Sequence, residues 1–323
     1  MKPVIKWCGG KQQLLDKIKE RLPSNLDDYP YWTYYEPFAG GLAVLLGLNL
    51  TTAVVNDINP ELINMYCQVR DNVEAVIREL GKFDMLHEAD PEPKLLYYDV
   101  RKDFNKCLGS NTPTQAARFI YLNKHCFNGL YRVNSRGEFN VPFNGKLSGR
   151  SFDPDHLREM SSRLKNVSIL NTDFEEAVKD ASVGDFVFFD SPYAPITATS
   201  FTDYTKEGFS YEDHVRLAKV FKELTNRGCY CMLTNHDTPL IRELYKDYKI
   251  EVVDVRRSIN RKGDGRTGKE VIITNYGLEA KKVSDVLSVD LHDSGAIISD
   301  AYDELYSELG LPEDRLVSKE NDI

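Results

Sequence analysis

The chain has 323 residues, of which 41% are hydrophobic and 28% are charged. This length can hold two domains, or one large domain with an insertion, and can bury a sizeable core. No apolar run approaches the ~18 residues that would suggest a membrane span, and the N-terminal MKPVIKWCGGK lacks the apolar core of a signal peptide. We therefore expect a cytoplasmic protein without a membrane partner.

The six cysteines are scattered along the chain, without a CxxC pair or a nearby Cys/His cluster. This pattern predicts reduced thiols, with neither disulfides nor structural zinc, and we expect no bound metal. Cys229 and Cys231 alternate with Tyr230 in an expected strand, where they are more simply explained as core residues than as ligands.

The net charge of −9 is distributed unevenly. Residues 278–323 hold twelve acidic and four basic residues and so carry −8, which leaves −1 for residues 1–277. Within this near-neutral body, basic residues outnumber acidic ones in residues 118–150 and 256–269. Two basic islands are typical of a polyanion-binding surface, although either island alone is more simply explained as a solvated face.

A glycine-containing loop, KWCGGK, precedes an expected amphipathic helix that stops before Pro23. Gly9 and Gly10 would let the backbone approach a ligand closely. Trp7 and Lys11 flank these glycines, and a ring and a cation beside them suit an adenine face and a carboxylate.

The next segment has the pattern of a nucleotide-binding βαβ unit. Residues 33–48 predict a strand into Glu36, a turn at Gly40 and then a helix. Residues 53–57 predict a second strand that ends at Asp57, where an acid can accept hydrogen bonds from ribose hydroxyls. The full GxGxxG fingerprint is absent, which argues against NAD.

The segment DFVFFDSPY supplies another acid after a strand. Its four apolar residues, 186–189, predict a strand buried on both faces. Asp190 and Tyr193 then stand at the mouth of this strand, and Pro192 stiffens the turn between them. The simpler alternative is that DSPY is only a strand-ending turn.

Three acids, Glu36, Asp57 and Asp190, therefore each follow an expected strand. Ligands of open α/β sheets bind beyond the carboxyl ends of the strands, so we expect these acids to share a site. Because three carboxylates would repel phosphates, the sequence favours a cationic adenosine cofactor such as a sulfonium.

Residues 59–106 and 113–125 have helical spacing, but residues 126–145 lose it. Turn signals there predict a β-hairpin or a bent loop. Its basic residues, with exposed apolar ones beside them, suit contact with a DNA groove. The alternative is an ordinary solvent-exposed hairpin.

After the interruption, the alternation of strands and helices resumes. Strands are expected in four segments: 166–173, 229–237, 248–258 and 270–277. A helix with a capping box is expected from Ser210 to Gly228. The sequence therefore predicts an α/β, Rossmann-like sheet with an inserted, mainly helical domain that contains a β-hairpin.

With these pieces placed, the sequence resembles the Dam family of DNA adenine methyltransferases, which modify the N6 amine of adenine in GATC. The segments that carry the resemblance, between about residues 4 and 277, are KWCGGK, YYEPFAGG, NDIN, FNGLYRVNSRGEFNVPF, DSPYAP, NHD and VRRSI. The resemblance implies S-adenosylmethionine as the cofactor, double-stranded DNA as the partner, and direct methyl transfer to a flipped base.

The resemblance also implies roles for individual residues. The residues implied to line the cofactor pocket are Trp7, Lys11, Phe38, Asp57, Asp173, Phe174 and Asp190, to which the βαβ pattern adds Glu36 and Gly40. The residues implied to contact DNA are Lys6, Phe127, Asn128, Leu130, Arg132 and Pro142, to which the second basic island adds Arg256 and Arg257. After Phe143 the family pattern is lost, and no phosphate contact is assigned there.

One departure concerns the catalytic turn, because the family motif is DPPY and Ser191 occupies its second position. The amine of adenine is a poor nucleophile, so catalysis needs two acceptors for its hydrogens: the Asp190 carboxylate and the main-chain carbonyl of Ser191. Tyr193 would stack on the flipped base, after Pro192 of the same turn. Serine keeps the carbonyl but loses the fixed φ, a penalty of ~1 kcal/mol or a few-fold in rate.

Three functions remain open at this point. The first is an adenine-N6 DNA methyltransferase of GATC-like specificity, the second a cytosine-N4 or other-site methyltransferase, and the third a DNA-binding module without turnover. We expect catalytic segments 1–65 and 161–277, a target-recognition domain 66–160, and an acidic appendage 278–323. We also expect a monomer or weak dimer, located at the nucleoid or in the cytoplasm of a phage host; a restriction-modification role stays open.

Overall fold

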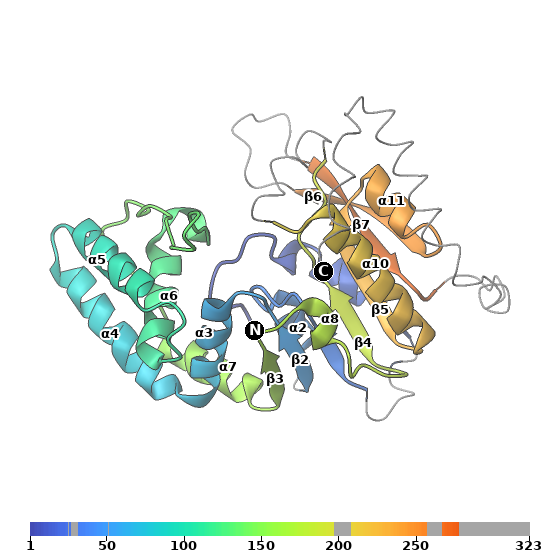
Figure 1. Ribbon diagram of the computed structural model, residues 1–323. Helices are drawn as coiled ribbons and strands as arrows, with labels where there is room; N and C mark the ends of the chain where they lie inside the picture. The colour runs from blue at the N-terminus through green and yellow to red at the C-terminus, as the bar shows by residue number, and fades with distance from the viewer. Residues whose placement is uncertain (25, 27–31, 51, 197–207, 257–266, 278–323) are drawn as a thin grey trace, which may run out of the picture.

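The computed structural model describes the chain except for residues 25, 27–31, 51, 197–207, 257–266 and 278–323. The acidic appendage, a polar segment after the catalytic turn and most of the second basic island therefore lie outside the described residues. Figure 1 shows the central sheet beside a group of helices, drawn in cyan and green, that comes from the middle of the chain.

A seven-stranded sheet in the order β3-β2-β1-β4-β5-β7-β6 confirms the α/β prediction. Its strands are β1 (Tyr34–Glu36), β2 (Ala53–Asn56), β3 (Val167–Leu170), β4 (Phe186–Phe189), β5 (Tyr230–His236), β6 (Lys249–Arg256) and β7 (Thr267–Thr274). The first five run parallel, whereas β7 is antiparallel to both of its neighbours. The chain reverses its direction of travel across the sheet between β1 and β4, which is where such sheets bind ligands.

Strand β4 lies at the centre of this sheet and is buried on both faces. Phe186 and Phe188 belong to one hydrophobic cluster, whereas Val187 and Phe189 belong to the other. Successive side chains of a strand point to opposite faces, so a continuous apolar run is what a central parallel strand requires. The strand predicted from FVFF is confirmed.

Two sets of helices cover the two faces of the sheet. The face of Val187 is covered by α8 (Phe174–Ala177), α10 (Tyr211–Asn226) and α11 (Pro239–Leu244). The face of Phe188 is covered by the 3-10 helix η1 (Lys11–Gln13), α1 (Leu15–Lys19) and α2 (Ala43–Leu48). The capping box predicted for α10 is present between Ser210 and Asp213. No helix in the described part of the chain could cross a membrane.

The inserted helices share a core with the sheet. They are α3 (Pro60–Asp71), α4 (Val73–Ala89), α5 (Pro93–Lys106), α6 (Pro113–His125) and α7 (Pro154–Leu164). Asn59, Thr112 and Asp153 each cap a helix whose first residue is proline, so local sequence fixes three of these starts. The expected domain boundary after residue 65 falls within α3, and the division into domains stays a prediction.

Residues 126–145, here called the recognition loop, have features of both predicted forms: a bent segment and a short antiparallel turn. Within it the structure has a 3-10 turn, η3 (Phe127–Gly129), and two isolated antiparallel bridges instead of paired strands. The side chain of Asn105 in α5 bonds both the amide and the carbonyl of Phe139, at 2.9 and 3.1 Å. A helix side chain therefore satisfies backbone groups that a partner strand would otherwise use.

Two helical glycines provide a matched test of this packing. A Cβ at Gly47 in α2 would overlap Leu15, whereas a Cβ at Gly81 in α4 would meet no atom within 4 Å. We predict that Gly47→Ala lowers the free energy of unfolding by about 1–2 kcal/mol. Gly81→Ala should raise it by up to about 1 kcal/mol through helix propensity. Urea unfolding of both variants measures these shifts, and equal stabilisation by both would contradict the packing of α2 against α1.

Candidate active site

The carboxyl ends of four adjacent parallel strands carry most of the predicted catalytic and cofactor-binding residues. Because β3, β2, β1 and β4 run parallel, their carboxyl ends lie at the same edge of the sheet. The predicted residues that follow these strands are Asp173 and Phe174 after β3, Asp57 after β2, Glu36, Phe38 and Gly40 at and after β1, and Asp190, Ser191, Pro192 and Tyr193 after β4.

Lys11 places a positive charge at this edge of the sheet. Its side chain is only 5% exposed, and its Nζ lies 2.6 Å from Oδ1 of Asp190 and 4.7 Å from the centre of the Tyr193 ring. It also donates a hydrogen bond to the carbonyl of Gly9, at 2.7 Å. Burial raises the pKa of Asp190 above its usual value, and the charge of Lys11 acts in the opposite direction. Asp190, 20% exposed, is thus a paired but accessible carboxylate.

Tyr193 is held by a residue far away in the sequence. Its hydroxyl donates a hydrogen bond to Oε2 of Glu270 in β7, at 2.8 Å, and its ring meets that of His236 edge-on at 4.8 Å. Burial and the nearby Asp190 raise the pKa of Tyr193 well above its usual value, so the hydroxyl keeps its proton. The ring therefore has a fixed position beside Asp190.

Glu36 is buried and differs from the charged carboxylate that the sequence predicted. Its Oε2 accepts hydrogen bonds from the Tyr34 hydroxyl at 3.0 Å and the Leu45 amide at 3.2 Å. Burial nevertheless raises its pKa to about 8, so Glu36 is protonated at neutral pH. The expectation of three charged carboxylates is wrong for this residue, and attraction of a cation is left to Asp57 and Asp190.

Gly40 makes the turn that follows β1 in a conformation that suits glycine. Its φ is +44°, and a Cβ there would lie 2.7 Å from the Trp7 ring. Its amide donates to Oδ2 of Asp57 at 3.0 Å, while its carbonyl accepts from the Tyr66 hydroxyl at 2.6 Å. The other oxygen of Asp57 accepts the amide of Asn59, also at 3.0 Å. This carboxylate thus fixes the ends of β1 and β2 together.

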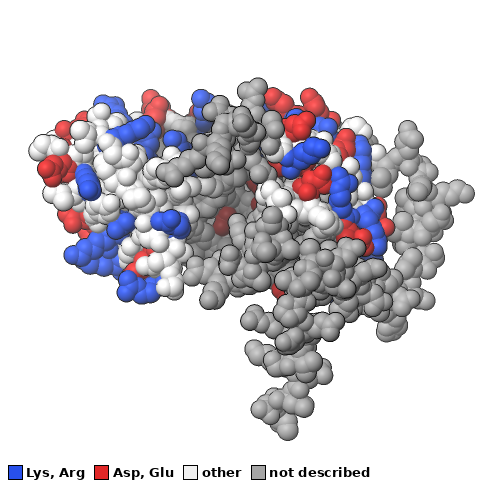
Figure 2. Space-filling view, turned by 90° about the horizontal axis from the view of Figure 1, so that it is seen from above, with Lys and Arg blue, Asp and Glu red and all other residues white. Residues whose placement is uncertain are grey.

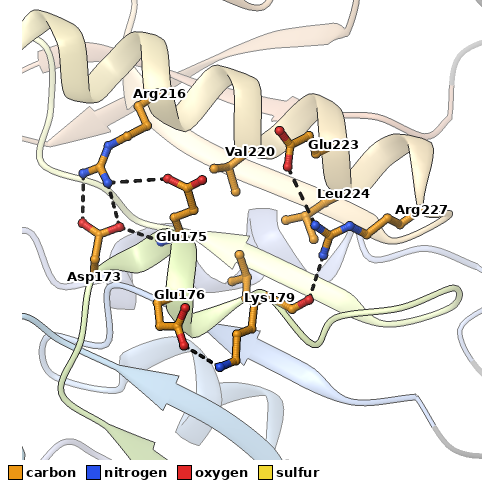
Figure 3. Close-up of a pocket in the computed structure, with 10 residues that line it drawn as sticks. Asp173, Glu175, Glu176, Lys179, Arg216, Val220, Glu223, Leu224 and Arg227 are labelled. Atoms are coloured by element: carbon orange, nitrogen blue, oxygen red, sulfur yellow. Dashed lines mark hydrogen bonds and ion pairs between the residues drawn. The ribbon is translucent and has the colours of Figure 1, made fainter.

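Asp173 caps α8 and pairs with a helix on the same face of the sheet. Figure 3 shows its two oxygens facing the guanidinium of Arg216 in α10, at 2.8 and 2.9 Å. The same guanidinium lies 4.3 Å over the Phe174 ring, which in turn packs on Phe38 with ring centres 5.4 Å apart. One arginine therefore contacts both Asp173 and Phe174.

A cavity of about 410 Å³ lies beside this pair, between α8 and α10. Its charged side chains are paired with one another in Figure 3: Glu176 with Lys179, and Glu223 with Arg227. Arg227 also donates to the carbonyl of Lys179 at 2.9 Å. Since these charges are satisfied within the protein, the cavity has no free group that indicates a ligand.

The predicted DNA-contacting residues cluster on the recognition loop and the N-terminal segment. Lys6 packs on Gly129, where a Cβ would lie 2.6 Å from the Lys6 Cβ, and its backbone bonds the side chain of Asn123. Phe127 and Asn128 are exposed, and Asn128 has a φ of +56°. Figure 2 shows Lys and Arg side chains around the helical group, at left, with Asp and Glu between them.

The other predicted contacts differ in their surroundings. Leu130 packs partly into the helical core, and the exposed Arg132 donates to the side chain of Asn140 at 2.7 Å. Pro142 is exposed, and its carbonyl accepts the amide of Phe127. Arg256 ends β6, but Arg257 lies outside the described residues.

Several residues around the catalytic turn had no assigned role in the sequence prediction. They are Thr234, Asn235 and His236 at the end of β5, with Glu270 in β7. Arg216 in α10, which contacts Asp173 instead of this turn, also had no assigned role. The NHD segment was the available signal, because β5 ends beside β4. The six cysteines are free thiols, and no group of three or more His, Cys, Asp or Glu side chains that could hold a metal ion occurs among the described residues.

Known DNA methyltransferases are similar to this chain over most of its length. Residues 7–259 match the family of D12 class N6 adenine-specific DNA methyltransferases. The chain is 43% identical over 284 residues to the type II methyltransferase M1.LlaDCHI of Lactococcus lactis subsp. cremoris, covering 86% of this chain and 96% of that protein. It is 41% identical over 287 residues to M.MjaIII of Methanocaldococcus jannaschii, covering 85% and 99%. The DNA adenine methylase of Escherichia coli K12 is 34% identical over 274 residues, covering 84% and 94%.

The raised pKa of Glu36 predicts a pH-dependent stability. The unfolded chain releases this proton near pH 4.3, whereas the folded protein holds it until about pH 8. Stability is therefore lost as pH rises through this window, by an amount on the order of a few kcal/mol. We predict that Glu36→Gln removes that loss, so that urea unfolding at pH 8.5 shows a variant more stable than the wild type. Glu212→Gln, at an exposed position of α10, should keep the wild-type pH dependence; identical curves for Glu36→Gln and wild type would contradict the assignment.

Proposed function

Because the chain belongs to the D12 class of N6 adenine-specific DNA methyltransferases, we propose that it methylates adenine within GATC sites of double-stranded DNA by flipping the base. The enzyme class and the methyl donor, S-adenosylmethionine, are those of the family. The GATC preference is supported by the resemblance of the recognition loop to the Dam sequences. The observation that carries the proposed mechanism is the accessible Asp190, held by Lys11 beside Tyr193.

The residues at the strand ends fit the donor. S-adenosylmethionine supplies an activated methyl group on a cationic sulfur when it is bound. Asp57 keeps free lone pairs beyond its two backbone hydrogen bonds, so it can accept from ribose hydroxyls. We assign the cofactor pocket to the predicted set: Trp7, Lys11, Glu36, Phe38, Gly40, Asp57, Asp173, Phe174 and Asp190.

The side chain of Trp7 has a second function in this proposal. Its ring lies against Gly40 and stacks on Tyr131 of the recognition loop, with ring centres 5.7 Å apart. It therefore contacts both the turn after β1 and the segment that we assign to DNA. A movement of the recognition loop would therefore be felt by the Trp7 ring and, through it, by the turn at Gly40.

The catalytic turn presents two acceptors to the target amine. The Asp190 carboxylate and the Ser191 carbonyl would draw the amine hydrogens away from the ring plane, which makes the nitrogen lone pair available. Lys11 favours the ionised form of Asp190, and an ionised carboxylate is the better acceptor. Tyr193, fixed through Glu270, offers its ring for stacking on the flipped base.

DNA would be contacted by the recognition loop and the adjoining N-terminal segment. We assign this role to Lys6, Phe127, Asn128, Leu130, Arg132 and Pro142, together with Arg256, which ends β6, and Arg257, which follows it in the sequence. Arg132 is exposed, and its Nε donates to the side chain of Asn140. This hydrogen bond would compete with a contact from the same nitrogen to a base edge or a phosphate. We further propose a monomer or weak dimer that acts on cytoplasmic DNA, with the tail 278–323 as an appendage outside catalysis.

The reaction and its site are tested together by transfer of labelled methyl groups. We predict incorporation into unmethylated GATC duplexes, and little into fully N6-methylated GATC or into a duplex with the site scrambled. Asp190→Asn should lower kcat by at least about 100-fold, because it removes the charged acceptor. Thermal unfolding followed by circular dichroism serves as the control for folding, because Asp190 itself belongs to the proposed cofactor pocket.

The alternative functions give different results in this assay. Label in cytosine would identify an N4 methyltransferase, and label in adenine outside GATC would overturn the specificity alone. Cofactor and DNA binding without any incorporation would identify a DNA-binding module that has lost turnover. Full activity of Asp190→Asn would overturn the catalytic site.

Arg216 offers a separate test of the cofactor assignment. Since it holds Asp173 and covers Phe174, we predict that Arg216→Ala weakens S-adenosylhomocysteine binding by about 5- to 10-fold. The value of kcat at saturating cofactor should change little. Arg227→Ala is the matched control, because Arg227 lies on the same helix at the other end of the cavity. Equal affinities of both variants would argue against Asp173 and Phe174 as pocket residues.

A further inference from the structure

Three consecutive residues at the end of β5 hold the catalytic turn. The Thr234 hydroxyl donates to Oδ1 of Asp190 at 3.1 Å. Nδ1 of His236 lies 2.8 Å from the carbonyl of Ala194; a carbonyl only accepts, so this nitrogen carries the proton. Between them, Asn235 contacts the turn at two positions. The geometry of the turn is therefore set by its neighbouring strand as well as by its own sequence.

Asn235 spans the turn with one side-chain amide. Its Oδ1 accepts the amide of Ala194 at 2.8 Å, and its Nδ2 donates to Oγ of Ser191 at 3.4 Å. Asn235 is fully buried and Ser191 is 1% exposed, so water does not replace these bonds easily. Asparagine offers a donor and an acceptor on one planar group, which is what a link between residues 191 and 194 requires.

We propose that Asn235 is a positioning residue that fixes the Ser191 carbonyl through the Ser191 hydroxyl. In the DPPY motif of the family that this chain resembles, a ring at the second position fixes φ covalently. Here a buried hydrogen bond at the same position supplies the constraint instead. This inference rests on the proposed function, because it concerns the acceptor that we assign to the target amine.

The two constraints exclude one another at position 191. A proline has no hydroxyl, so it would fix φ but leave Nδ2 of Asn235 without its acceptor. Among the described residues, the Ser191 amide donates no hydrogen bond to the backbone, so a proline nitrogen would break no such bond. Alanine at this position would provide neither the ring nor the hydroxyl. Serine, proline and alanine at position 191 therefore test the hydrogen bond and the ring separately.

A double-mutant cycle between positions 191 and 235 tests the proposal. We expect Ser191→Ala to lower kcat about 5-fold, with the KM for DNA and for S-adenosylmethionine within about 2-fold of wild type. Ser191→Pro should restore kcat to within about 2-fold of wild type. Asn235→Ala should lower kcat about 30-fold, since Ala194 also loses a partner, and adding Ser191→Ala should cause no further loss.

The control is Ser161→Ala, which removes another buried serine hydroxyl, bonded to the carbonyl of Arg70 at 2.9 Å. It should leave kcat unchanged, and thermal unfolding reports any loss of stability in each variant. If Asn235→Ala does not fold, the comparison of alanine and proline at position 191 decides alone.

The proposal would be overturned by wild-type kcat in Ser191→Ala, or by effects of the two alanine variants that multiply in the double variant. A Ser191→Pro variant slower than Ser191→Ala would do the same. Each of these can occur while Asp190→Asn is inactive, in which case only the inference about Asn235 fails. An active Asp190→Asn would instead remove the proposed function on which the inference rests.

Discussion

The ion pair between Lys11 and Asp190 joins two parts of the chain that are far apart in sequence. A lysine buried to this degree needs a charged partner, since an unpaired ammonium would lose its hydration without compensation. The pair therefore fixes the N-terminal segment over the end of β4. The same segment carries Lys6 against Gly129 and Trp7 against Tyr131. The N-terminal segment, from Lys6 to Lys11, therefore contacts both the recognition loop and the proposed catalytic carboxylate.

The charge balance at the strand ends is less acidic than the residue types indicate. Glu36 is protonated at neutral pH because it is buried, although it keeps two hydrogen-bond donors. A neutral Glu36 spares the edge a third negative charge beside Asp190, whose own pKa is already raised by burial. Burial also raises the pKa of Asp57, and two backbone amides that bond its oxygens act in the opposite direction. The three acids thus have different surroundings: Glu36 is neutral, Asp57 is bonded by backbone amides and Asp190 is paired with Lys11.

Sequence patterns predicted the parts of the fold that depend on local rules. The run 186–189 has the continuous apolar character that a central strand needs, and Ser210 with Asp213 forms the capping box that starts α10. Contacts between distant segments were not predictable in this way, because no spacing in the chain encodes them. Tyr193 bonds Glu270, and Asp173 pairs with Arg216, across different elements. The hairpin in residues 126–145 is reduced to isolated antiparallel bridges, one of them between Val133 and Phe139, and an α5 side chain that no local pattern predicts bonds the backbone of Phe139.

Ser191 shows how the same limit affects an argument about function. Viewed in the sequence alone, the serine is a loss, because it removes the ring that restricts φ and adds nothing visible in exchange. In the fold its hydroxyl meets a buried amide from β5, 44 positions along the chain. A hydrogen bond to a buried partner restricts the residue only in the folded state, whereas a proline ring also restricts the unfolded chain. The two solutions can therefore give the turn a similar geometry while they differ in stability, and a departure from a motif has to be weighed with the residues that surround it.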